Sequence, residues 1–77
     1  MSLWNKKKKN TDEQAYIEYV LGEITRAVKQ NKKMAQVKVE SDKELDWLDR
    51  FATSRSYEIA PAITVNGETY YAIWGWL

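Results

Sequence analysis

The sequence contains neither cysteine nor histidine. Without cysteine there are no disulfide bridges and no thiol nucleophiles. Without either residue there are no Cys/His zinc sites, no histidine general bases and none of the usual haem or iron–sulfur ligands. Glycine and proline are scarce, at three and one in 77 residues. No glycine falls between a predicted strand and a predicted helix, which excludes a P-loop or a dinucleotide-binding loop. We therefore expect no metal site and no cofactor.

Long hydrophobic runs are also missing. No apolar run approaches the roughly 18 residues of a membrane-spanning helix, and no signal-peptide pattern precedes the body of the chain. We therefore expect no transmembrane segment and a cytoplasmic location. The length of 77 residues allows one small domain, which buries only about 60% of its unfolded surface.

The net charge of +1 conceals an asymmetry along the chain. Residues 1–33 have a charge balance of +4, and residues 34–77 have a balance of −3. The positive half begins with four consecutive lysines, Lys6, Lys7, Lys8 and Lys9. Because these lysines repel one another and have few apolar neighbours, we expect residues 1–10 to form a disordered basic tail. Residues 11–77 are then expected to form the single domain.

Residues 11 to about 31 have the pattern of an amphipathic helix. Thr11 is the expected N-cap, and Gln14 completes a capping box. Asn31 can end the helix in a left-handed conformation. The apolar residues follow the spacing of one helical face: Ile17, Val20, Leu21, Ile24, Ala27 and Val28.

The apolar period changes to two over residues 35–40, which predicts a half-buried strand. Ser41 is the expected N-cap of a second helix over residues 42–53, and Glu44 completes its capping box. The apolar face of this helix consists of Leu45, Trp47, Leu48, Phe51 and Ala52.

The remaining residues predict a β-hairpin. Asn66-Gly67 suits a type I′ turn, which requires positive φ at both central residues, and the strands are expected over 57–65 and 68–76. An uninterrupted register then divides the side chains between two faces. The set expected to face the core is Tyr57, Ile59, Ile63, Val65, Tyr70, Trp74 and Trp76. Tyr71 and Ile73 are expected on the outer face.

Pro61 decides the predicted strand order. Since proline cannot donate a ladder hydrogen bond, its strand belongs at a sheet edge or at a bulge. The C-terminal strand is then central, with strand 35–40 on its other side. We therefore predict an α+β fold, a small two-layer α-β-α-β-β sandwich with both helices on the aromatic face of a three-stranded sheet.

Carboxylates are the only candidates for acid–base chemistry. The acidic cluster comprises Glu40, Asp42, Glu44, Asp46 and Asp49. We interpret it as favourable charge at a helix N-terminus together with a solvated face. A calcium loop is rejected, because its sixth position would be Trp47 and its twelfth Thr53. We therefore expect no catalytic residues and no enzyme activity.

Two surfaces could bind a partner. The basic residues Arg26, Lys29 and Lys33 recur along one side of the first helix and, with Lys6 to Lys9, could hold nucleic-acid phosphates or rest on an anionic membrane surface. The aromatic C-terminus suggests instead a protein interface, for which Tyr71, Ile73 and Trp76 are the predicted contacts.

The leading hypothesis is a small non-enzymatic binding protein. It would act as a regulator or inhibitor by protein–protein contact, with Arg26 and Lys29 as steering charges, and a homodimer is compatible with it. The alternative is a nucleic-acid-binding protein that uses the basic tail and the first helix. In size and composition the chain resembles small accessory proteins of phages and mobile elements, although no motif supports that likeness.

Overall fold

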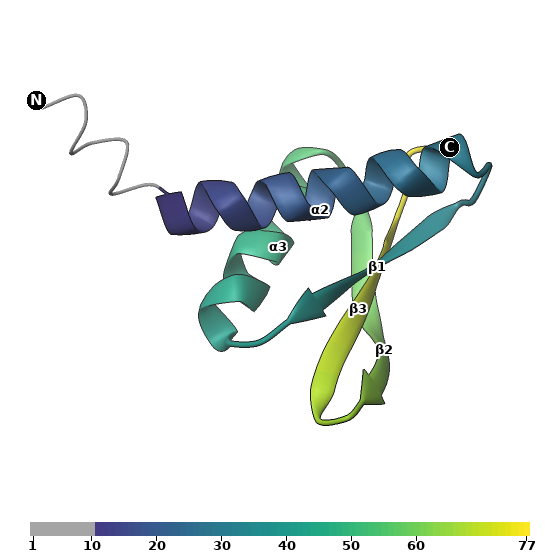
Figure 1. Ribbon diagram of the computed structural model, residues 1–77. Helices are drawn as coiled ribbons and strands as arrows, with labels where there is room; N and C mark the ends of the chain where they lie inside the picture. The colour runs from purple at the N-terminus through teal and green to yellow at the C-terminus, as the bar shows by residue number, and fades with distance from the viewer. Residues whose placement is uncertain (1–10) are drawn as a thin grey trace, which may run out of the picture.

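The computed structural model describes residues 11–77 as two helices and a three-stranded sheet (Figure 1). The elements are α2 (Thr11–Lys29), β1 (Met34–Val39), α3 (Asp42–Ser54), β2 (Glu58–Val65) and β3 (Glu68–Trp74). This order confirms the predicted α-β-α-β-β fold. The predicted basic tail, residues 1–10, lies outside the described residues. Over residues 11–77, neither helix is long and apolar enough to cross a membrane.

Helix α2 contributes one buried stripe to the core. Its buried side chains are Tyr16, Val20, Ile24 and Ala27, which lie three or four residues apart. The helix ends at Lys29, two residues earlier than expected, and Asn31 then has a φ of 59°. The amide of Lys32 donates to the Ala27 carbonyl at 2.8 Å, so the predicted left-handed end is confirmed. The Thr11 side chain, and with it the predicted capping box, lies outside what the structure describes.

Helix α3 begins as predicted. The amide of Glu44 donates to the Ser41 hydroxyl at 3.2 Å, and the Glu44 carboxylate accepts from the amide of Glu40 at 2.9 Å. The first bond satisfies a helix amide that has no partner within the helix, and the second pairs the amide of the residue before the N-cap, whereas a regular capping box pairs that of the N-cap itself. The helix buries Leu48, Phe51 and Ala52 against the sheet.

The sheet has the strand order β1-β3-β2, with both neighbours antiparallel to the central β3. The strand that contains Pro61 therefore lies at an edge, as predicted. Asn66 and Gly67 both have positive φ, at 53° and 78°, and connect β2 to β3 in a two-residue turn. In Figure 1 both helices lie on the same side of the sheet, and the β2–β3 hairpin extends past them.

The predicted hairpin register is confirmed from the turn to Ile63, which lies opposite Tyr70, and a β-bulge in β2 makes it wrong on the far side of Ala62. The register shifts after Pro61, where Ala62 has no partner on β3. Pro61 therefore lies opposite Tyr71, and Ile59 lies opposite Ile73, each one residue away from the predicted pairing. Because a bulge adds one residue to one strand only, side chains on its two sides change faces.

The predicted core face of the hairpin is right for Tyr57, Ile59 and Trp76, which pack against the core, and wrong for the other four residues of the set. Ala35 and Val37 of β1 pair with Ile73 and Tyr71, so these four side chains share one face. Ile73 is 0% exposed, and the helices pack on this face. Tyr70 and Trp74 therefore lie on the opposite face, together with Ile63 and Val65 beyond the bulge.

The C-terminal residues return to the core side through Gly75. Its φ is 128°, and a Cβ there would lie 3.0 Å from the Tyr57 Cα, so only glycine fits without strain. Trp76 then packs edge-on against Tyr57, with ring centroids 5.7 Å apart. The Trp76 indole N–H also donates to the Lys32 carbonyl at 3.3 Å, which ties the chain end to the turn after α2.

Candidate functional site

The sheet face opposite the helices carries an apolar surface, which we call the open face. Residues that alternate with the core row lie on it: Met34, Ala60, Ile63, Val65, Tyr70, Ala72 and Trp74. Met34, Ile63 and Val65 are 45%, 45% and 42% exposed. In the described part of the chain no helix covers this face (Figure 1). Such an apolar patch is typical of an interaction site.

The charges of the open face are largely paired at one corner. The Lys38 ammonium lies 3.4 Å from the Glu40 carboxylate and 3.5 Å from that of Glu68. Glu68 foremost, and then Glu40, raise the pKa of Lys38 above its ordinary value. The single ammonium of Lys38 offsets one of the two carboxylate charges, so this corner keeps a net charge of −1 beside the apolar side chains.

Two tyrosines of α2 block part of the free edge of β1. The Tyr16 hydroxyl donates to the Lys38 carbonyl at 2.9 Å, and the Lys38 amide donates to the Tyr19 hydroxyl at 3.0 Å. Both backbone groups of Lys38 thus point away from β3. Burial, and secondarily the charge of Glu44, raise the pKa of the Tyr16 hydroxyl above its ordinary value, so Tyr16 remains a neutral donor.

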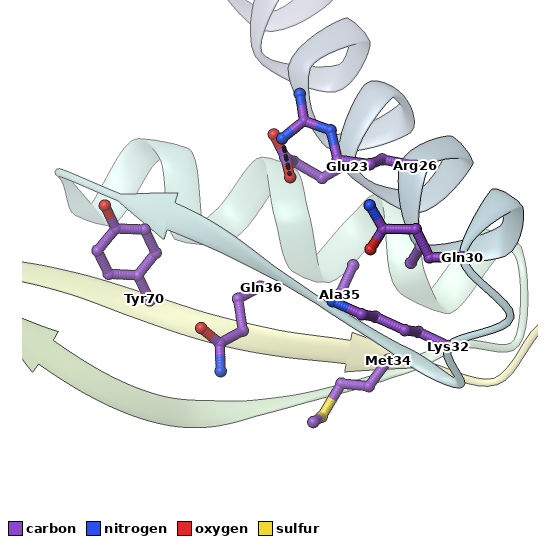
Figure 2. Close-up of a pocket in the computed structure, with 9 residues that line it drawn as sticks. Glu23, Arg26, Gln30, Lys32, Met34, Ala35, Gln36 and Tyr70 are labelled. Carbon is purple, nitrogen blue, oxygen red and sulfur yellow. Dashed lines mark ion pairs between the residues drawn. The ribbon is translucent and has the colours of Figure 1, made fainter.

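The other half of the β1 edge lies in a groove of about 630 Å³. Figure 2 shows Glu23, Arg26 and Gln30 extending from α2 on one side of β1, and Gln36 and Tyr70 on the other. Arg26 and Glu23 form an ion pair at 3.8 Å in which the Arg26 side chain remains 69% exposed. Exposed pairs of this kind contribute little to stability, so Arg26 can exchange Glu23 for another anion.

The predicted interface residues are not on the open face. Ile73 is fully buried in the core and cannot contact a partner in the folded protein. Tyr71 is half-buried on the same face, and Trp76 packs against the core from the chain end. The hypothesis placed Tyr71 and Ile73 on the outer face because it took the alternate set with Tyr70 and Trp74 as the core face, whereas the pairing of β3 with Ala35 and Val37 of β1 makes the face of Tyr71 and Ile73 the buried one. The structure corrects that placement.

The predicted basic residues are brought together only in part. Arg26 and Lys29 stand in the last turn of α2, and Lys33 follows it as an exposed residue. Lys6 to Lys9 lie outside the described residues. Lys32, which the sequence-based hypothesis omitted, lines the groove beside Arg26.

The acidic cluster is engaged in local structure. Glu44 caps α3, and Asp46 pairs with Arg50 at 2.9 Å along the helix. Across residues 11–77, no three acidic side chains are grouped so as to hold a metal ion.

The open-face residues Met34, Ile63, Val65, Tyr70 and Trp74 were missed as contacts by sequence reasoning. One signal could have indicated part of the set. Ala35, Val37 and Val39 form the apolar row of β1, so Met34 must lie on the opposite face. The hairpin residues carry no equivalent signal, because both sets of alternate residues are rich in apolar side chains.

Comparisons of the chain with protein-family models, with curated proteins and with solved structures find no match.

Proposed function

We propose that this protein is a small non-enzymatic binding module that docks a protein partner on its open face. The observation that carries the proposal is the apolar surface formed by Met34, Ile63 and Val65, each more than 40% exposed, beside Tyr70 and Trp74. Solvent exposure of such a surface is unfavourable by about 25 cal/mol per Å² of apolar area. A partner that covers it removes this cost.

The composition of the open face supports a protein as the partner. Tyr and Trp are frequent at the centres of protein interfaces, because they bury large areas at low cost in side-chain entropy. The charged residues of the face include Glu58 and Glu68, whose carboxylates disfavour nearby phosphates. A regulator or inhibitor would act from this face by covering a surface that its partner needs. A second copy of the chain is one form that the partner can take.

The test is affinity capture with two variants of the tagged protein. Ile63→Ser/Val65→Ser removes apolar side chains from the open face, where both are exposed and the core is not touched. Val28→Ser is the matched control, because Val28 is 49% exposed on α2. We expect a stoichiometric protein band with the wild type and with Val28→Ser, and its loss with the double variant. Sedimentation of each purified protein shows whether the partner is a second copy.

Nuclease treatment separates this function from nucleic-acid binding. A protein contact survives nuclease, whereas phosphate binding through Arg26, Lys29, Lys33 and the N-terminal lysines does not, and it weakens steeply with salt. Bands that persist with Ile63→Ser/Val65→Ser, or that disappear after nuclease treatment, would contradict the proposal.

A further inference from the structure

The free edges of the sheet are protected unequally. The β2 edge contains Pro61 and the bulge at Ala62, two devices that prevent pairing with another strand. One end of the β1 edge is closed by the hydroxyls of Tyr16 and Tyr19 on the backbone of Lys38. Among the described residues, the segment of β1 before Lys38 has no such protection.

The register identifies the backbone groups that this segment presents. In an antiparallel ladder, residues alternate between those bonded to the neighbouring strand and those directed away from it. Since Lys38 directs its amide and carbonyl away from β3, and the β1–β3 register is uninterrupted, Gln36 and Met34 do the same. The groove therefore contains unpaired backbone donors and acceptors at two alternate residues, which is the spacing that an added strand requires.

The surroundings of the groove are cationic. Residues 26–33 hold four cations, Arg26, Lys29, Lys32 and Lys33, and no acidic residue. Glu23, the one carboxylate in the groove, is held by Arg26 at 3.8 Å. This charge favours an acidic ligand and repels a basic one.

We propose that the β1 edge at Met34–Gln36 binds an extended acidic peptide segment of a partner protein by adding it to the sheet as a fourth strand. The peptide backbone pairs with Met34 and Gln36, and its carboxylates lie near Arg26 and Lys32. The site differs from the open face because the peptide pairs with the backbone of β1 at the strand edge, although Met34 and Tyr70 of the open face also line the groove (Figure 2).

The test uses two fluorescein-labelled hexapeptides, one in which valine alternates with glutamate and one in which lysine replaces each glutamate. We expect the glutamate peptide to bind, as measured by fluorescence anisotropy, at least tenfold more tightly than the lysine peptide. Lys32→Glu should weaken glutamate-peptide binding at least fivefold. Lys43→Glu, the same charge change at an exposed position of α3, should leave it within twofold. Absence of binding, or equal binding of both peptides, overturns the proposal.

An amide NMR titration locates the bound peptide. Strand addition shifts the amide signals of Met34 and Gln36 and slows their hydrogen exchange, whereas docking on the open face shifts those of Ile63 and Val65. Shifts confined to Ile63 and Val65 would overturn the edge site while leaving the proposed function intact. If the protein self-associates and Lys32→Glu abolishes this association, the edge binds a second copy of the chain, and the proposal of a peptide from a partner protein is overturned.

Discussion

At the scale of single residues, the pair Tyr16 and Tyr19 links the core to the sheet edge. Tyr16 is buried and packs its ring 6.1 Å from that of Trp47, centroid to centroid, while its hydroxyl reaches the Lys38 carbonyl. Tyr19 accepts from the Lys38 amide. A buried phenol usually finds a hydrogen-bond partner, and here the partners are backbone groups that would otherwise be open to another strand.

Tyr16 makes the folded protein sensitive to alkaline pH. Because burial raises its pKa, the folded state holds the phenolic proton at pH values where the unfolded state releases it. The stabilisation is complete below the unfolded pKa of about 10 and is lost as the pH rises above it. We expect the free energy of unfolding, measured with urea, to fall more between pH 8 and pH 11 in the wild type than in Tyr16→Phe.

Tyr16→Phe should lower the free energy of unfolding by about 1 kcal/mol at pH 8, since the Lys38 carbonyl loses its hydroxyl donor. An equal loss of stability in the two proteins between pH 8 and pH 11 would refute the role of Tyr16 in this pH dependence.

At the scale of elements, two glycines show how differently the same residue serves a helix and a strand end. Gly22 lies within α2, where a Cβ would have no atom within 4 Å outside the helix. Gly75 follows β3 with a φ of 128°, and its position lets Trp76 turn back to the core side. The helix at Gly22 does not use the wide range of backbone angles that glycine allows, whereas the chain at Gly75 requires it.

Replacing each glycine by alanine should have opposite effects. Gly22→Ala should raise the free energy of unfolding by about 0.5–1 kcal/mol, because alanine loses less backbone entropy in a helix. Gly75→Ala should lower it by roughly 1–3 kcal/mol, because alanine is strained at this φ and its Cβ would lie 3.0 Å from Tyr57. Urea titrations followed by tryptophan fluorescence measure both changes. Effects of the same sign would contradict the conformations assigned to the two glycines.

At the scale of the whole molecule, the fold has two layers and buries one face of its sheet. Three of the four largest fully buried side chains, Leu48, Val20 and Val37, come from α3, α2 and β1, and the fourth, Ile73, comes from β3. Each core-forming element therefore depends on the others. The opposite face meets no second layer in the part of the chain described, which is why we assign the partner contact to it.

The two faces can be distinguished by one substitution made on each. Ile73→Ala removes a fully buried side chain from the core and should cost about 2–5 kcal/mol. Ile63→Ala makes the same change on the open face at a side chain that is 45% exposed, and it should cost less than about 1 kcal/mol. Urea unfolding followed by far-UV circular dichroism tests this. Equal costs would mean that the faces are assigned incorrectly.

Local patterns in the sequence determined much of this fold. The apolar spacing of the two helices, the Ser41 cap and the Asn66-Gly67 turn each act within a few residues, so they can be recognised without the tertiary structure. Pro61 also sufficed for the strand order, because the proline has no amide to donate and this restricts its strand to an edge or a bulge.

Only the tertiary structure decided which hairpin face is buried and where partners can bind. Apolar residues occupy both faces of β3, so alternation could not choose between Tyr70 and Ile73; the pairing of Ile73 with Ala35 of β1 makes the choice. The unpaired Ala62 then changes the face of every β2 side chain beyond it. The tyrosine contacts that leave only part of the β1 edge open join residues 19 and 22 positions apart. Contacts at such separations depend on how the elements pack, which no local pattern encodes.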